Sequence, residues 1–312
     1  MNRLPAAILG ALCVGVAAGV AWGLAYPQNA LAPSLVRALS DGAAVAAFGL
    51  AIVPAYDVER YRGELGRRAS RPLIVAAAVW VVAELVRLLV GAAEAAGAST
   101  GRVDVRTAVV FATDTAVGHA GVVCLGAAAV VCALAVAGAR EGVRPASTLG
   151  VVVVGASAIG VGGRSLVGHL SESPWGGIAV AVHTLAAAIW CGSLAALVAT
   201  VTHRGQWARV LPRFSQVSLG CVVVLLVFGV AGAAVTLGSP ADLYATGYGR
   251  VLMAKILVTV VLVVLAARNR AAWLPAARSH RATATVSRVR SRVELAIMAM
   301  ALTLAAALAV TG

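Results

Sequence analysis

The feature that most constrains the fold of this chain is a series of long, uninterrupted apolar runs. A helix that crosses a bilayer needs about 20 apolar residues. Nine runs come close to that length, at about 5–25, 35–56, 72–92, 107–138, 147–163, 175–202, 215–238, 250–267 and 293–311. The fourth is too long for one crossing and too short for two, so we expect a helix that is tilted or extends past the headgroups. The pattern predicts an all-α, polytopic transmembrane bundle of about eight or nine spanning helices.

The composition excludes the main classes of water-soluble protein. Of the 312 residues, 61% are hydrophobic and only 12% are charged, and the mean hydropathy is +0.94. A soluble domain would carry about 25% charged residues, so cytosolic enzymes, secreted modules and disordered chains are all excluded. The apolar residues form unbroken stretches rather than alternating with polar ones, which favours spanning helices over an outer-membrane barrel.

Arginine gathers in alternate loops between the apolar runs. The formal net charge is +13, and most arginines lie in the loops at about 57–71, 139–146, 203–214 and 268–292. Because cytoplasmic loops are enriched in basic residues, the alternation predicts a cytoplasmic amino end and an outer carboxyl end. The basic residues are therefore topology signals, and we expect no nucleic-acid partner.

The first run fits two descriptions. It is either an uncleaved helix, which we favour, or a signal peptide that is cut near Ala30 or Ala32. Both leave residue 30 outside, so the orientation of the later runs is the same.

Charged side chains inside a bilayer are costly and are therefore functional candidates. Asp41 lies about two turns inside the outer end of the second run, and Asp114 is placed similarly in the fourth. Lys255 lies in the outer third of the eighth run. Glu84 and Arg87, near mid-depth in the third, are three residues apart and share a helix face, so we expect an internal ion pair.

Three histidines are the strongest candidates for a functional site. His183 lies about two turns into the sixth run, His119 lies near mid-depth in the fourth, and His169 belongs to the outer loop GRSLVGHLSESPW. Neutral imidazole is a good copper ligand, and an added thiolate such as Cys191 would favour Cu(I). Each histidine alone fits an interhelical hydrogen bond equally well. Three in the outer half, beside two carboxylates, favour a metal or proton site.

Enzyme motifs are missing from the sequence. No GxSxG, HExxH or P-loop pattern occurs, and those are the patterns that would supply nucleophile–base pairs, zinc ligands or a phosphate cradle. We therefore do not expect an enzyme.

Three blocks in the second half of the chain resemble the copper resistance protein D family. They are HTLAAAIWCGSLAALV, RFSQVSLGCVVVLLVFGVAGAAVTLGS and YATGYGRVLMAKILVTVVLVVLAARNR. The residues that match the family pattern are His183, Trp190, Gly192, Arg213, Phe214, Ser215, Gly229, Tyr248, Gly249, Arg250, Lys255, Asn269 and Arg270. Ser193 stands where a second glycine is usual, and Cys191 replaces a larger apolar residue. The resemblance covers about residues 165–270.

The resemblance implies copper handling at the cytoplasmic (inner) membrane of a bacterium, commonly movement of the copper ion inward. It divides the chain into N-terminal transmembrane helices at 1–164, whose first helix is a candidate signal anchor, and a family-like domain at 165–312. We see no appended soluble copper-binding domain, so we expect a separate extracytoplasmic copper-binding protein as the delivery partner, besides the lipid bilayer.

Residues and resemblance together predict that copper is captured from outside by His169 and His183, with His119 as a third candidate ligand. The ion would then pass inward between the fourth and sixth runs. Asp41 and Asp114 would lower the energy of a cation in low dielectric. Further supporting polar residues are Glu84, Arg87, Lys255, Trp190 and Cys191.

Two other functions stay open at this point. One is a copper-delivery or assembly factor without net transport. The other is a haem-binding membrane electron carrier, in which His119 and His183 would be the axial ligands. The oxidation state of copper, proton coupling and the oligomeric state are not determined by the sequence.

Overall fold

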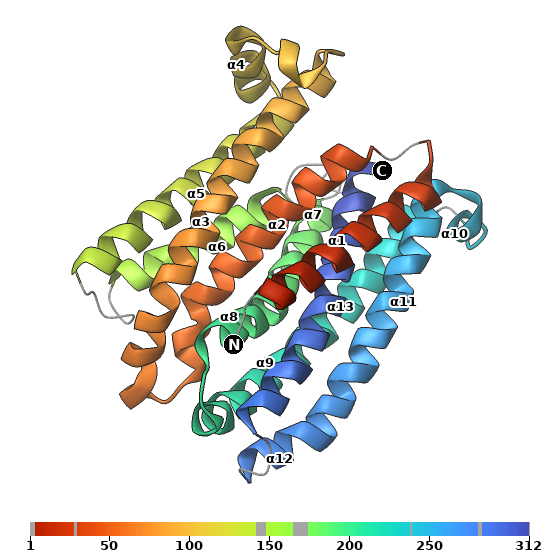
Figure 1. Cartoon of the computed structure of the whole chain (residues 1–312). Coiled ribbons are helices and arrows are strands. Elements are labelled where there is room, and N and C mark those ends of the chain that lie inside the picture. Colours follow the sequence, from red (N-terminus) through yellow and green to blue (C-terminus); the bar gives the residue numbers. More distant parts are fainter. Residues whose placement is uncertain are drawn as a thin grey trace.

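The computed structural model describes residues 4–27, 30–141, 148–164, 174–237, 239–279 and 283–311. Every regular element in these ranges is helical (Figure 1). The helical spans long and apolar enough to cross a membrane are Leu31–Tyr56, Glu59–Ala95, Ala116–Arg140, Gly176–Thr200, Arg204–Ala234, Gly247–Ala277 and Ala284–Thr311. Two shorter apolar helices lie at Gly10–Ala25 and Leu149–Gly163. The predicted all-α, polytopic class is confirmed.

The α-helices follow one another along the chain with short connections. They are α1 (Leu4–Ala25), α2 (Leu31–Ile52), α3 (Glu59–Ala95), α4 (Val105–Asp114), α5 (Ala116–Glu141), α6 (Thr148–Gly163), α7 (Pro174–Ala187), α8 (Ser193–Thr200), α9 (Arg204–Thr236), α10 (Asp242–Ala245), α11 (Gly247–Arg268), α12 (Leu274–Arg278) and α13 (Ala284–Thr311). Short 3-10 helices lie at η1 (Val53–Tyr56) and η2 (Thr100–Arg102). The π-helices are η5 (Ala188–Gly192) and η6 (Asn269–Trp273).

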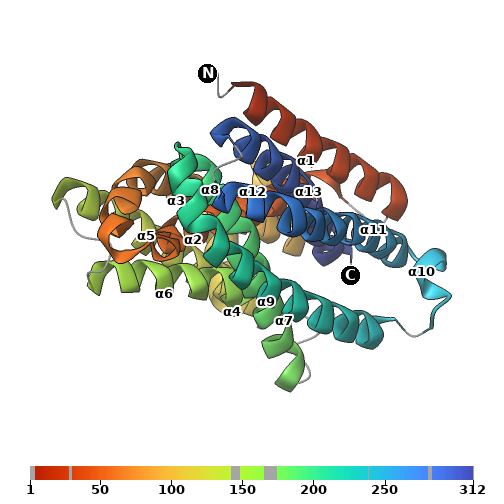
Figure 2. The same ribbon diagram turned by 90° about the horizontal axis from the view of Figure 1, so that it is seen from below.

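Helix α2 is the centre of the bundle. It packs against α3, α6, α8, α13 and η5, and its span is the most buried of the long ones, whereas those of α9 and α11 are the least buried. Figure 2 shows α1, α11, α9 and α7 along the periphery. The main core includes Trp80, Leu194, Leu197 and Trp207, which are almost completely buried. Helices α9 and α11 therefore present most of their apolar surface to lipid.

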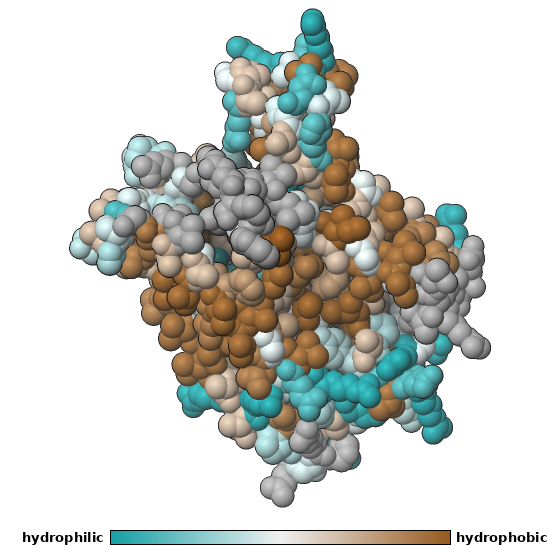
Figure 3. All heavy atoms as spheres, turned by 180° about the vertical axis from the view of Figure 1, so that it is seen from behind, coloured by the Kyte–Doolittle hydropathy of each residue, from teal (hydrophilic) through white to brown (hydrophobic). Residues whose placement is uncertain are grey.

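Several arginine-rich connections lie together at one end of the bundle. Arg209 forms two bonds to the Asp57 carboxylate, of 2.9 and 3.1 Å. Arg68 donates to Thr202 Oγ1 at 2.6 Å, and Arg288 donates to the Thr202 carbonyl oxygen at 3.4 Å. Figure 3 shows a hydrophilic band beneath a broad hydrophobic surface. The connections that follow α2 and α8 thus meet the start of α13 at one end of the bundle.

The fourth apolar run, for which we expected one helix that is tilted or extends past the headgroups, forms two helices, of which only α5 is a candidate span. The backbone is extended at Thr115, with φ −114° and ψ 143°, which separates α4 from the spanning helix α5. Thr115 Oγ1 donates to the Phe111 carbonyl oxygen at 2.7 Å and accepts from the Gly118 N–H at 2.9 Å. These bonds make a tight turn, and α4 lies beyond the rest of the bundle (Figure 1).

Candidate functional site

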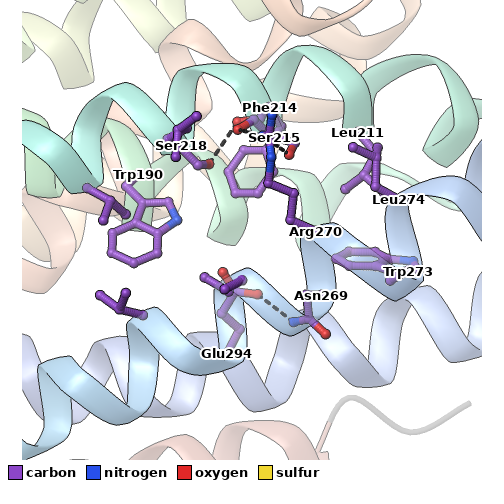
Figure 4. Close-up of a pocket in the computed structure, with 15 residues that line it drawn as sticks. Trp190, Leu211, Phe214, Ser215, Ser218, Asn269, Arg270, Trp273, Leu274 and Glu294 are labelled. Carbon is purple, nitrogen blue, oxygen red and sulfur yellow. Dashed lines mark hydrogen bonds between the residues drawn. The ribbon is translucent and has the colours of Figure 1, made fainter.

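Two π-helical turns line one cavity. A π-helix is rare and often marks a functional site. Helix η5 joins α7 to α8, and η6 joins α11 to α12. Trp190 from η5, together with Asn269 and Trp273 from η6, lines a cavity between α9, α11 and α13 (Figure 4). The two π-helices therefore contribute to the same space, which is the first candidate site.

Most of the cavity wall is apolar. The apolar residues that line it are Leu211, Phe214, Leu219, Val222, Val263, Ala266, Ala267 and Leu274. Arg270 Nη1 donates to the carbonyl oxygen and to Oγ of Ser215, at 2.8 and 2.7 Å, and so ties η6 to α9. An apolar wall with a few convergent polar groups is typical of a binding site for a small ligand.

Glu294 is the acidic group of this cavity. It lies on α13 and is only 3% exposed. Asn269 Nδ2 donates to Glu294 Oε2 at 2.8 Å, and Figure 4 marks this bond. Glu294 was not among the predicted site residues. It is a carboxylate within the ninth apolar run, and the cost of burying a charge in the bilayer is the signal that points to it.

Trp190 and Cys191 belong to this cavity and its surroundings. Trp190 is 3% exposed, and its Nε1 is buried with no hydrogen-bond partner in the described ranges. Cys191 is also buried, and its thiol interacts electrostatically with Glu294 and with Cys221 of α9. The sequence offered Cys191 as an additional ligand beside His183, whereas the structure brings it close to Glu294.

His183 faces the junction of α7, α9 and α11. Its ring packs on α9, where a Cβ added to Gly229 would lie 3.5 Å from His183 Cε1. The Nδ1 atom is buried and has no hydrogen-bond partner among the residues that the structure describes. The ring interacts with the Leu225 backbone and, electrostatically, with Lys255 of α11. Along α9, this junction lies two to three turns from the cavity.

The other candidate histidines are not brought to His183. His119 is exposed in the first turn of α5, and its Nε2–H donates to the Thr113 carbonyl oxygen at 2.5 Å. Asp114 ends α4, is exposed, and accepts from Thr113 Oγ1 at 2.8 Å. Both therefore lie at the start of the span or before it, not at the predicted depth. His169 lies outside the described residues.

The helix packing gives no support to the predicted passage between the fourth and sixth runs. Helix α6 packs against both α5 and α7, so it separates His119 from His183. The same separation removes these two histidines as axial ligands of one haem. Within the part of the chain that is described, no group of three His, Cys, Asp or Glu side chains is arranged to hold a metal ion.

A second polar site lies where α2, α3 and α6 meet. This ion cluster consists of Arg37, Asp41, Glu84, Arg87 and Arg164. Glu84 is 1% exposed and accepts hydrogen bonds from Ser40 Oγ at 2.5 Å and from Trp80 Nε1 at 3.2 Å. It also forms an ion pair with Arg164. Glu84 is therefore fully partnered.

The expected ion pair between Glu84 and Arg87 is wrong, because each pairs with another helix. Arg37 Nε, Arg164 Nη1 and Arg87 Nη1 lie 3.6, 3.7 and 3.8 Å from the Asp41 carboxylate. Three positive charges thus surround Asp41, so it offers no uncompensated negative charge to a cation, contrary to the expectation. Arg37 and Arg164 were not among the predicted site residues.

Comparison with known families gives two matches. A model described as "Copper resistance protein D-like, N-terminal domain" matches residues 28–174, and one described as "Copper resistance protein D" matches residues 208–309. The resemblance seen at 165–270 therefore extends over most of the chain, and His183 with η5 lies between the two matched ranges. Comparison with curated proteins and with solved structures gave no match. The chain belongs to the copper resistance protein D family, and this membership implies a role in copper resistance or uptake.

Proposed function

We propose that this protein carries copper across the cytoplasmic membrane of a bacterium, from the outer side inward. The observation that carries the proposal is the buried Nδ1 atom of His183, which has no hydrogen-bond partner in the described ranges. A neutral imidazole nitrogen is a good ligand for copper. In a family with a role in copper resistance or uptake, an unpartnered imidazole nitrogen inside the bundle is best explained as a copper ligand.

The surroundings of His183 favour a neutral ring with Nδ1 available. The ring interacts with the Leu225 backbone, and because Nδ1 has no partner, the group that can donate there is Nε2–H. Metal-binding histidines usually donate their other N–H to a carbonyl or carboxylate, which fixes the tautomer and the ring orientation. His169, which precedes α7 in the chain, enters the proposal as a second outer ligand on sequence grounds alone.

A few polar side chains lie on or beside α9 on the inner side of His183. His183 lies beside Gly229, Trp190 lines the cavity farther along, and Ser215 at the far end holds Arg270. With a rise of 1.5 Å per residue, Gly229 and Ser215 are about 21 Å apart along the helix axis. This is most of the roughly 30 Å hydrocarbon core. We propose this series, ending at Glu294, as the route of copper.

Lys255 limits how tightly copper binds at His183. It interacts electrostatically with the His183 ring, and a nearby ammonium group repels a cation. A transport site has to bind its ion strongly enough to admit it and weakly enough to release it. We assign this weakening role to Lys255. A separate extracytoplasmic copper-binding protein would deliver the ion to the outer end.

Copper uptake into sealed proteoliposomes, with bound metal counted on the purified protein, tests the proposal. We expect His183→Ala to lose most of the uptake. His119→Ala is the matched control and should transport normally, because the His119 ring bonds only at the α4–α5 turn. Normal uptake by His183→Ala would overturn the assignment of that residue.

The same assay separates the other functions. Stoichiometric copper binding without uptake by the wild type would identify a delivery or assembly factor. A Soret band on the purified protein would identify a haem-binding electron carrier. Absence of copper binding would overturn the proposal as a whole.

A further inference from the structure

Glu294 is a buried carboxylate without a counter-ion in the described part of the chain. It is 3% exposed and lines the cavity between α9, α11 and α13, into which Figure 4 shows its side chain extending. Asn269 Nδ2 donates to Oε2 at 2.8 Å. No described residue forms an ion pair with either oxygen or donates to Oε1. One neutral donor is thus all that the surrounding helices offer this acid.

Few titratable groups face Glu294 from the helices that pack around α13. Helix η5 presents the Cys191 thiol, and Cys221 of α9 interacts with that thiol in turn. Helix η6 presents Arg270, whose Nη1 is bonded to Ser215. These are two neutral thiols and one guanidinium that already has acceptors, so none of them replaces a missing counter-ion.

The remaining neighbours of α13 bring no charge that pairs with Glu294 among the described residues. Helices α1 and α8 carry no charged residue in the described ranges, and the charged residues of α2 belong to the ion cluster around Asp41 and Glu84. The arginines of α9 lie in its first three turns, where Arg209 and Arg213 are bonded to Asp57. On α11, Lys255 is about 21 Å from Asn269 along the helix axis. Arg268 of α11 is next to Asn269, and Arg290 and Arg292 of α13 lie within about one turn of Glu294, but among the described residues none of them forms an ion pair with it.

A carboxylate without a counter-ion is costly to bury as an anion, and that cost falls when it binds a proton or a cation. If copper moves along the proposed route from His183 beside α9 to Glu294, it reaches a carboxylic acid that stays protonated until the copper ion arrives. We propose that Glu294 is a proton-exchange site at the inner end of the copper route, where proton and copper compete for the same carboxylate. This inference rests on the proposed function and adds proton linkage to it.

The exchange step is balanced without any redox partner. The O–H bond of the Glu294 carboxylic acid breaks, a copper–oxygen contact forms, and the proton passes to water on the cytoplasmic side. No electron is transferred, and one positive charge is released for each copper ion bound. When copper leaves inward, the carboxylate takes up a proton again.

The test is copper uptake into proteoliposomes at a series of internal pH values, with a pH-sensitive dye enclosed. For the wild type, lowering the internal pH by one unit should slow initial uptake by up to about tenfold, as expected for competition with a single proton. Glu294→Gln cannot exchange a proton, so uptake should be at least about tenfold slower and insensitive to internal pH. Glu94→Gln, which changes an exposed carboxylate at the end of α3, is the matched control and should behave as wild type.

A second variant keeps the test decisive if Glu294→Gln does not fold. Asn269→Ala removes the single donor to the carboxylate, so the carboxylate should hold its proton more firmly and the pH response should shift to higher pH. Wild-type pH response in Glu294→Gln, or in Asn269→Ala when the first variant is unfolded, overturns the inference. Failure of the wild type to import copper at all would instead overturn the proposed function.

Discussion

At the scale of single residues, two glycines let backbones touch in the middle of the bundle. A Cβ on Gly49 of α2 would lie 2.0 Å from the carbonyl carbon of Gly192 in η5, and one on Gly192 would lie 2.3 Å from the Val45 carbonyl oxygen. Beside this contact, Ser193 Oγ lies 2.8 Å from the Tyr56 hydroxyl oxygen. Ser193, where the family usually has a second glycine, is therefore accommodated by a hydrogen bond to α2's extension η1.

We predict that Gly192→Ala destabilises the protein. The added methyl group has to push α2 away from η5, and overpacking of this kind costs about 1–3 kcal/mol. The measurement is the unfolding transition of the purified protein in detergent. Gly220→Ala on the lipid-facing side of α9, where a Cβ meets no atom within 4 Å, is the control and should not lower stability. Equal stability of the two variants would contradict the close contact of α2 with η5.

At the scale of helices, the π-turn η5 explains why the position of Cys191 did not follow from spacing. A π-turn contains more residues than an α-turn, so side chains after it are rotated relative to those before it. A regular α-helix over 175–202 would keep a constant relation between His183 and Cys191. In the structure, His183 faces α9 and α11, whereas Gly192 contacts α2 and Cys191 lies near Glu294.

Packing of α3 against the end of α6 depends on the ion pair of Glu84 with Arg164. Their side chains are 2% and 13% exposed. Losing one partner strands a buried charge, so we predict that Glu84→Gln or Arg164→Met lowers the free energy of unfolding by about 3 kcal/mol. The double variant should lose less than the sum of the two. A double-mutant cycle on unfolding in detergent measures this coupling, and strictly additive losses would contradict it.

At the scale of the whole molecule, the orientation in the membrane decides whether the proposed copper route from His183 to Glu294 leads inward or outward. We predict that Gly101→Cys, between α3 and α4, reacts with an impermeant thiol reagent on intact cells. Arg204→Cys, at the arginine-rich end, should react only after the membrane is opened, because basic connections stay in the cytoplasm. The native cysteines all lie within helices, so the unmodified chain is the background control. The reverse labelling pattern would place His183 near the cytoplasm and contradict inward transport.

The all-helical, membrane-spanning fold class was predictable because the lipid environment constrains each spanning segment by itself. Each span has to satisfy its own backbone hydrogen bonds and be apolar over about 20 residues, so both properties are visible in a single stretch of sequence. Glu294 and Arg164 could also have been predicted as site residues from the sequence, because a charged residue next to or inside an apolar run is costly in a bilayer. They were missed because each lies at the edge of an apolar run, where a charged residue is easily taken for a flanking one.

Which side chains meet could not be derived from single stretches. Asp41 with three arginines, Glu84 with Arg164 and the distance of His119 from His183 all depend on how helices far apart in the sequence rotate and pack. The turn at Thr115 and the π-turn η5 change those rotations locally, without any change in hydropathy. Apolar length and loop charge therefore establish a polytopic helical protein from the sequence, while the cavity of Glu294 exists only because α9, α11 and α13 pack around it.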